Sequence, residues 1–260
     1  MNGNDSSGNG DSPQFELAFE HGKGERIEDS PRIRVSARAR RLAIRVFPDA
    51  RVEVVVPPRA RPREVERFIA AHREWIDSRR AAALRNRPVP QPFPPAAIEF
   101  RVTAERRRLH LAGGTGRIRL VESGADERML RAMGAYSNAG LRTALRTWLL
   151  RAARNRLLPR VAALAASTGT AYSRVSIRRQ RSRWGSCSAR GTISLNCCLL
   201  FQRPEVVDYL IVHELMHVKH MNHSARFWQA VERHCADWRS LDRELVQGWR
   251  HVPRWVFSEE

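Results

Sequence analysis

Apolar and polar residues alternate in two short segments near the start of the patterned part of the chain. The period is two over residues 42–46 and again over residues 52–56, and Pro48-Asp49-Ala50 lies between them. A period of two is typical of strands with one buried face, so the pattern predicts a β-hairpin. From Pro62 the apolar spacing changes to three or four residues, which predicts a helix ending before Pro88.

The middle of the chain predicts a small sheet followed by a long helix. Three short alternating segments surround Gly113-Gly114, a pattern that favours an antiparallel sheet. These segments are residues 98–102, 108–111 and 117–121. Apolar residues then recur with a helical period from Asn138 to Ala166, with a kink expected at Pro159. Two more alternating strands are expected at residues 175–178 and 192–196.

Composition divides the chain into five parts. Residues 1–32 are rich in Gly, Ser, Asn and Asp, which predicts a disordered acidic tail. Proline dominates residues 88–95, so this segment is expected to be an extended linker. Between them, residues 33–87 are expected to form an N-terminal hairpin-helix subdomain. The main α+β domain is expected over residues 96–250, with a C-terminal tail at residues 251–260.

Length and hydropathy limit the class of protein. The chain has 260 residues, 42% of them hydrophobic, and can bury a substantial core. No apolar run approaches the length of about 18 residues that a membrane span requires. The first five residues, Met1-Asn2-Gly3-Asn4-Asp5, lack the basic and apolar regions of a signal peptide, so the expected location is the cytoplasm. None of the four cysteines forms a C-x-x-C pair, so neither a zinc ribbon nor a disulfide framework is indicated.

The chain is strongly basic. Its formal net charge is +19, and 44 of its 46 basic residues are arginine, because only Lys23 and Lys219 are lysine. This balance permits binding to nucleic acid or another polyanion through a basic surface. The alternative is a solvated charged face, with the arginines reflecting a codon bias of the whole genome.

The most informative motif is His-Glu-x-x-His, formed by His213, Glu214 and His217 within an apolar segment. Pro204 is a favourable first helical residue, so the motif is expected on a helix. Four residues turn a helix by about 400°, which brings both histidines to one face, where they can share a metal. Glu214 then lies beside the metal and can take a proton from a zinc-activated water. The alternative is a core helix with two hydrogen-bonded histidines.

A catalytic zinc usually has three protein ligands, and two histidines compete for the third position. His220 lies on nearly the same helix face as His213, but three ligands along one straight helix cannot form a tetrahedral set. His223 can complete the set if the chain turns after the helix. Asn222 tolerates the left-handed backbone conformation, and Ser224 is a good N-cap for a following helix. We therefore predict His223 as the ligand and His220 as a solvated or supporting residue.

Four segments carry a resemblance to a known family. They are Arg181-Ser182-Arg183-Trp184-Gly185-Ser186-Cys187-Ser188, Gly191-Thr192-Ile193-Ser194-Leu195-Asn196, Tyr209 through His217, and Asn222-His223-Ser224 with Phe227-Trp228. In their order and spacing they resemble the YgjP-like metallopeptidase-domain family, which is related to SprT-like and other zincin metallopeptidases. The resemblance is strongest from Val175 to Trp228 and is traceable back to Arg41.

The resemblance implies a fold and a chemistry. The expected fold is α+β and zincin-like, with the motif helix beside a small, mostly antiparallel sheet. The family's pattern implies a zinc-dependent hydrolase with metal ligands at His213, His217 and His223. It also implies a catalytic glutamate at Glu214.

Substrate contacts are expected from the strands and the loop that precede the motif helix. A strand edge beside a metal can bind an extended peptide by adding it to the sheet, so Trp184 and Asn196 are candidate contacts. Arg181 or Arg183 can stabilise the oxyanion that develops at the scissile group. The alternative is that Trp184 anchors the core and that the arginines are solvated.

The sequence therefore predicts a zinc metallohydrolase, most simply a metallopeptidase acting on a peptide or protein, with Glu214 as general base. Three alternatives stay open. The first is a metal-dependent hydrolase of nucleotide phosphoanhydrides, of the pyrophosphatase type, with the arginines of residues 178–183 holding phosphate. The second is a nucleic-acid-binding module with a structural metal. The third is a protease that acts on DNA-bound proteins.

Overall fold

The structure is a computed structural model of the chain that describes residues 31–86, 91–122 and 129–258. Residues 1–30 of the expected N-terminal tail and residues 88–90 of the expected linker lie outside these residues, whereas Arg32, the last residue of the expected tail, begins a strand. The described chain divides into two compact units, one ending at Leu84 and the other beginning at Arg85. Each unit is described by itself.

The first unit is a three-stranded sheet followed by two helices. Strands β2 (Ala43–Val46) and β3 (Val52–Val56) pair in antiparallel fashion, which confirms the predicted hairpin. Strand β1 (Arg32–Val35) adds to the other edge of β3 in parallel and was not predicted. The predicted helix is present but is divided into α1 (Pro62–Ala71) and α2 (Arg73–Arg85). No glycine or proline marks the break, so the sequence pattern reads as one helix.

The second unit begins with a four-stranded sheet in the order β4-β5-β7-β6. Strands β4 (Ala97–Phe100), β5 (Glu105–Gly113) and β6 (Arg119–Glu122) confirm the three predicted segments. Strand β7 (Met129–Met133) was not predicted. It lies parallel to β5 and antiparallel to β6, so the expectation of a purely antiparallel sheet was wrong.

A second sheet, in the order β8-β10-β9, lies against the motif helix. Strands β8 (Arg174–Arg178) and β10 (Thr192–Asn196) match the predicted strands and pair in parallel. The short strand β9 (Gly185–Cys187) pairs with β10 in antiparallel fashion. The sheet is therefore mixed rather than mostly antiparallel, and β9 forms one of its edges.

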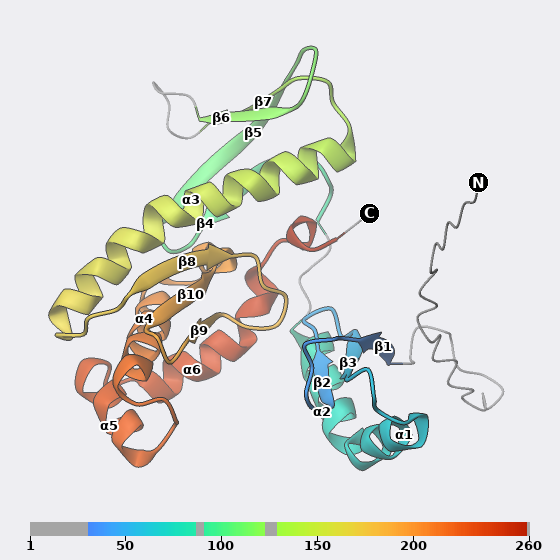
Figure 1. Cartoon of the computed structure of the whole chain (residues 1–260). Helices are drawn as coiled ribbons and strands as arrows, with labels where there is room; N and C mark the ends of the chain where they lie inside the picture. The colour runs from blue at the N-terminus through green and yellow to red at the C-terminus, as the bar shows by residue number, and fades with distance from the viewer. Residues whose placement is uncertain (1–30, 87–90, 123–128, 259–260) are drawn as a thin grey trace, which may run out of the picture. The chain divides into compact units, whose positions relative to one another are not determined.

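The long helix α3 (Asn138–Ser167) runs between the two sheets of this unit and continues through Pro159 (Figure 1). The apolar face of α3 includes Leu145, Leu149 and Leu157, and these three side chains are fully buried. Polar contacts from neighbouring turns of α3 link it to β5 and to α4 (Pro204–Lys219). Arg156 donates to Glu105 of β5 with a 3.0 Å contact from Nε, and Arg160 donates to Asp208 at 2.8 Å from Nη2.

The remaining helices complete the second unit. They are the 3₁₀ helix η2 (Cys197–Phe201), α4 (Pro204–Lys219), α5 (Ala225–His234), α6 (Trp238–Gln247), η3 (Gly248–His251) and η4 (Arg254–Val256). The expected C-terminal tail from residue 251 was wrong, because Val252, Trp255 and Val256 are buried in the core. No helix among the described residues is long and apolar enough to cross a membrane.

Candidate metal centre

Helix α4 carries the His-Glu-x-x-His motif and starts as the sequence predicts. Pro204 occupies its first turn, where a proline costs no hydrogen bond, and Glu205 complements the positive helix end. Most of its residues are buried by the surrounding core. His213 and His217 are one turn apart, and their ring centroids lie 4.9 Å from each other.

His223 joins these two histidines from the segment between α4 and α5. One ligand atom from each of the three rings lies within 4.8 Å of the others, the only such group of three among the described residues. Nε2 of His213 and Nε2 of His223 are 3.2 Å apart. Two ligands of a tetrahedral zinc with bonds of about 2.0–2.1 Å are separated by about 3.3 Å. The donor set and its spacing therefore fit a zinc ion.

His220 takes a supporting position. Helix α4 ends at this residue, where the backbone turns to an extended conformation. Its carbonyl oxygen lies 3.0 Å from Nδ1 of His217. Because a carbonyl can only accept, Nδ1 of His217 carries the proton, and Nε2 keeps its lone pair for a metal. The side chain of His220 is not part of the cluster.

Glu214 lies beside the histidines in a nearly closed environment. Glu214 is only 4% exposed, and Oε2 of its side chain has no hydrogen-bond partner among the described residues. Burial raises its pKa to about 8, although the charge of Arg183 acts in the opposite direction. Burial, with His217 and His223, lowers the pKa of His213 to about 3. Both shifts favour the uncharged forms, as expected where water is excluded.

Gly185 of β9 makes room for this carboxylate. A Cβ atom at this position would lie 2.6 Å from Oε1 of Glu214, far inside the normal contact distance. No side chain larger than hydrogen fits there without moving the carboxylate. The side chain of Glu214 on α4 therefore packs directly against the backbone of β9 at Gly185.

A family model for the YgjP-like metallopeptidase domain matches residues 40–247, which is most of the chain. The chain belongs to the YgjP-like metallopeptidase-domain family. Because the match begins before β2, this family domain includes most of the first described unit as well as the second. Membership supports a metal-dependent peptidase. No curated protein matches the chain.

Two solved metallopeptidase zymogens show limited similarity. Abylysin from Pyrococcus abyssi is 25% identical, with 33% of this chain and 87% of that chain covered, at a TM-score of 0.30. Jannalysin from Methanocaldococcus jannaschii is 23% identical, with 34% and 90% covered, at a TM-score of 0.29. These TM-scores are too low to add to the description of the fold.

The YgjP-like centre has a polar support that the sequence analysis missed. Tyr209, one turn before His213, donates its hydroxyl to Oδ1 of Asp242 on α6 at 2.8 Å. The same hydroxyl oxygen lies 3.5 Å from Nδ1 of His213 and can accept its proton. This contact leaves Nε2 of His213 facing Nε2 of His223. Asp242 is 33 residues beyond Tyr209, and no spacing in the sequence connects them.

Aromatic rings pack against one side of the three histidines, of which His223 is exposed. Phe227 stacks on the ring of His217, with centroids 4.4 Å apart, and is fully buried. Trp228 lies 5.6 Å from the ring of His223 and stacks on Trp238 of α6. Both Phe227 and Trp228 come from α5, so this helix supplies the apolar wall of the centre. Such a wall limits water around the ligands.

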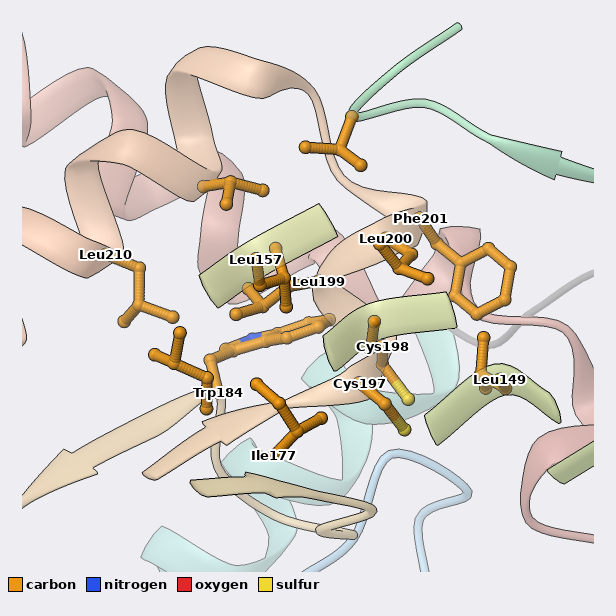
Figure 2. Packing of buried hydrophobic residues seen from close by; sticks show 14 of the residues in the cluster. Leu149, Leu157, Ile177, Trp184, Cys197, Cys198, Leu199, Leu200, Phe201 and Leu210 are labelled. Carbon is orange, nitrogen blue, oxygen red and sulfur yellow. The ribbon is translucent and has the colours of Figure 1, made fainter. Parts of the chain in front are cut away.

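Two of the predicted substrate contacts are structural. Trp184 is 8% exposed, and its ring stacks on Trp249 and lies in the core with Leu199 and Leu210 (Figure 2). Asn196 is fully buried, and its amide nitrogen donates to the carbonyls of Gln180 and Arg183, each at 2.8 Å. Asn196 therefore has no surface that a substrate can reach, and Trp184 has very little. They instead fix the loop that leads to β9.

The two arginines of this loop differ. Arg181 is half-buried, and its guanidinium lies 5.8 Å from the ring centre of Phe257 near the C-terminus. Arg183 is exposed, and its charge acts on Glu214. The charge of Arg183 thus connects this loop with the candidate centre.

Proposed function

We propose that this YgjP-like protein is a zinc-dependent metallopeptidase with His213, His217 and His223 as metal ligands and Glu214 as general base. The observation that carries the proposal is the convergence of three imidazoles beside a buried carboxylate, one oxygen of which has no partner in the residues that the structure describes. A structural metal site needs no such carboxylate. A bound zinc would supply a Lewis acid that polarises a carbonyl and makes water acidic enough to react near neutral pH.

The protein's own residues orient the reactants and move the proton. Glu214 accepts a proton from the attacking water and then donates it to the leaving nitrogen. Its burial suits both roles, because the proton then moves between the carboxylate and the reacting atoms with little competing water. The hydrogen bonds to His220 and Tyr209 hold the rings of His217 and His213 in place.

Strand β9 is the proposed place for the substrate. It forms an edge of the three-stranded sheet, and its first residue, Gly185, faces Glu214. An extended peptide can pair with this edge through backbone hydrogen bonds, which places a scissile bond near the carboxylate. Arg183 is the proposed partner of the developing oxyanion, because it is exposed and its charge already acts at Glu214.

Metal content measured by mass spectrometry tests the ligand set. Purified wild type loaded with zinc should retain about one equivalent, and His223→Ala should lose it. His220→Ala is the matched control, because only its backbone carbonyl takes part, and it should keep the metal. Equal zinc retention by wild type and His223→Ala would contradict the proposed third ligand.

Substrate assays separate peptide hydrolysis from the competing chemistry. The zinc-loaded protein should cleave an unfolded protein such as casein and should release no phosphate from nucleoside triphosphates. Phosphate release without proteolysis would replace the proposed activity with phosphoanhydride hydrolysis. Repeating the proteolysis assay with duplex DNA tests whether a polyanion changes the rate.

A further inference from the structure

The second unit contains a basic cavity that includes none of the proposed metal-centre residues. It has a volume of about 520 Å³ and opens beside strand β4. We call it the Arg101 cavity; it is lined by residues 91–92 and 95–99, by Arg101, Arg106 and Phe201, and by residues 250–253. Its volume lies within the range of about 300–1,000 Å³ that is usual for small-molecule sites.

Positive charge dominates the lining. Arg101, Arg106 and Arg250 are three of the lining residues, and Glu99 is the single acidic residue among them. The nearby Glu244 accepts from Arg203 with both oxygens, at 2.8 Å and 2.6 Å, and also interacts with the charge of Arg101. The cavity therefore concentrates cationic groups without a matching set of carboxylates.

One of these guanidiniums has an unused donor. Nη1 of Arg101 is buried and has no hydrogen-bond partner among the described residues. A buried donor on a charged group is costly when it is unpaired. Since this atom has almost no accessible surface, an anionic ligand in the cavity would form a charge-assisted bond to Arg101 once the guanidinium turns toward it.

His251 adds a second polar group beside the arginines. Nε of Arg250 donates to Nε2 of His251 at 3.3 Å, so the imidazole is neutral and Nδ1 carries its proton. Burial, followed by the charges of Arg101 and Arg250, lowers the pKa of His251. The ring therefore avoids adding a further positive charge to the unliganded cavity.

Apart from Gln91, the other lining residues are apolar. Ile98, Phe201 and Val252 are buried residues of the main core that also border the cavity, and several prolines lie at its rim. A site with a cationic part and an apolar part fits a ligand that has an anionic group and an apolar body. A phosphoryl group carries up to two negative charges and several acceptor oxygens, which suits three guanidiniums better than a single carboxylate does.

We propose that the Arg101 cavity binds a small phosphorylated molecule, with the phosphoryl group among Arg101, Arg106 and Arg250 and an apolar body against Phe201 and Val252. This site goes beyond the proposed peptidase activity and does not depend on it. No residue of the metal centre lines the cavity.

Isothermal titration calorimetry of the full chain with phenylphosphonate tests the proposal. This probe has a phosphoryl dianion, an apolar ring and a bond that resists hydrolysis. We expect saturable one-to-one binding by wild type at 0.15 M salt and at least tenfold weaker binding by Arg101→Gln. Arg250→Gln should show the same loss; because Arg250 is exposed, its replacement leaves the core unchanged.

Two controls distinguish this cavity from other anion sites. Arg154→Gln removes an exposed arginine of α3 that does not line the cavity, and it should bind as wild type does. His223→Ala removes a proposed metal ligand and should also keep the binding. Loss of binding in His223→Ala with normal binding in Arg101→Gln would assign the phosphonate to the metal centre and overturn the proposal. No binding by wild type, or an equal loss in Arg154→Gln, would overturn it as well.

Discussion

The metal centre and the contacts that hold α3 both contain polar groups that are partly or fully removed from water. They differ in whether those groups are paired with a partner of the protein. Around α3, charges are matched: Glu105 accepts from Arg107 and Arg156, and Asp208 accepts from Arg160. At the centre, Oε2 of Glu214 has no hydrogen-bond partner within the described part of the chain, and Nε2 of His213 faces Nε2 of His223. Matched groups stabilise a fold, whereas unmatched groups are costly unless a ligand or substrate completes them.

The largest expected effect comes from removing the unmatched carboxylate. Glu214→Gln should lower kcat by about 10³-fold, because general-base catalysis commonly contributes about 10²–10⁴-fold. Zinc content should not change, since the three histidines remain. The free energy of unfolding should not fall, because no hydrogen bond to Oε2 is lost. Casein cleavage, metal analysis and urea unfolding on the same preparations measure all three; full activity would remove Glu214 from the mechanism.

A smaller loss of activity is expected when Glu214 is displaced but kept. In Gly185→Ala the added Cβ would lie 2.6 Å from Oε1 of Glu214, so the carboxylate must move. A displacement of about 1 Å can cost about 10²-fold in rate. Ser186→Ala, one residue further along β9, is the matched control and should retain activity. Comparable kcat values for the two variants would show that β9 does not position the carboxylate.

The sequence predicts the residues of the metal centre more readily than the residues that hold them in place. His213, Glu214 and His217 follow from helical spacing, and we inferred His223 from the turn signals after the helix. The Tyr209–Asp242 contact could not be inferred, because it depends on how α6 packs against α4. Residues near the motif were also assigned contacts with substrate that the structure does not give them, since Trp184 and Asn196 are buried.

The fold divides in the same way between local and distant interactions. The hairpin, the start of α1 and the long α3 each depend on neighbouring residues, and each was predicted. Strand β7 and the parallel pairs depend on residues distant in sequence, which periodicity alone does not reveal. The C-terminal residues have no regular period, yet Trp255 and Val256 complete the core.

In the paired contacts around α3, a single replacement should lower the free energy of unfolding and leave the catalytic rate unchanged. Arg156→Met keeps most of the apolar stem but removes the donors to Glu105, which links α3 to β5. We expect a loss of about 1–3 kcal/mol in the free energy of unfolding, because a partly buried carboxylate is left with fewer partners. Zinc content and kcat should stay close to wild type at 25 °C. Urea unfolding measures the effect, and unchanged stability would show that this ion pair is not a support.

Tyr209 belongs to both kinds of region. Its hydroxyl is paired with Asp242, and it also lies near His213 of the metal centre. Tyr209→Phe removes the hydroxyl that bonds Asp242 and lies near Nδ1 of His213. Loss of such a support commonly weakens metal affinity by about 10–100-fold, and we expect the lower end because the 3.5 Å contact is long. Competition with a zinc chelator measures the affinity. An unchanged zinc affinity would limit Tyr209 to packing.

The smallest effect is expected in the pH dependence of stability. Hydrogen bonding from Arg156, the largest cause, lowers the pKa of Glu105 from 4.5 to about 2. The carboxylate binds fewer protons in the folded state than in the unfolded state, so its contribution is complete above pH 4.5 and is lost as the pH falls toward 2. Between pH 5 and pH 3, wild type should therefore lose more of its unfolding free energy than Arg156→Met does. Because Glu105 is about one-third exposed, solvent screening keeps the difference small. Parallel slopes for the two proteins would contradict a pairing of Glu105 with Arg156 in solution.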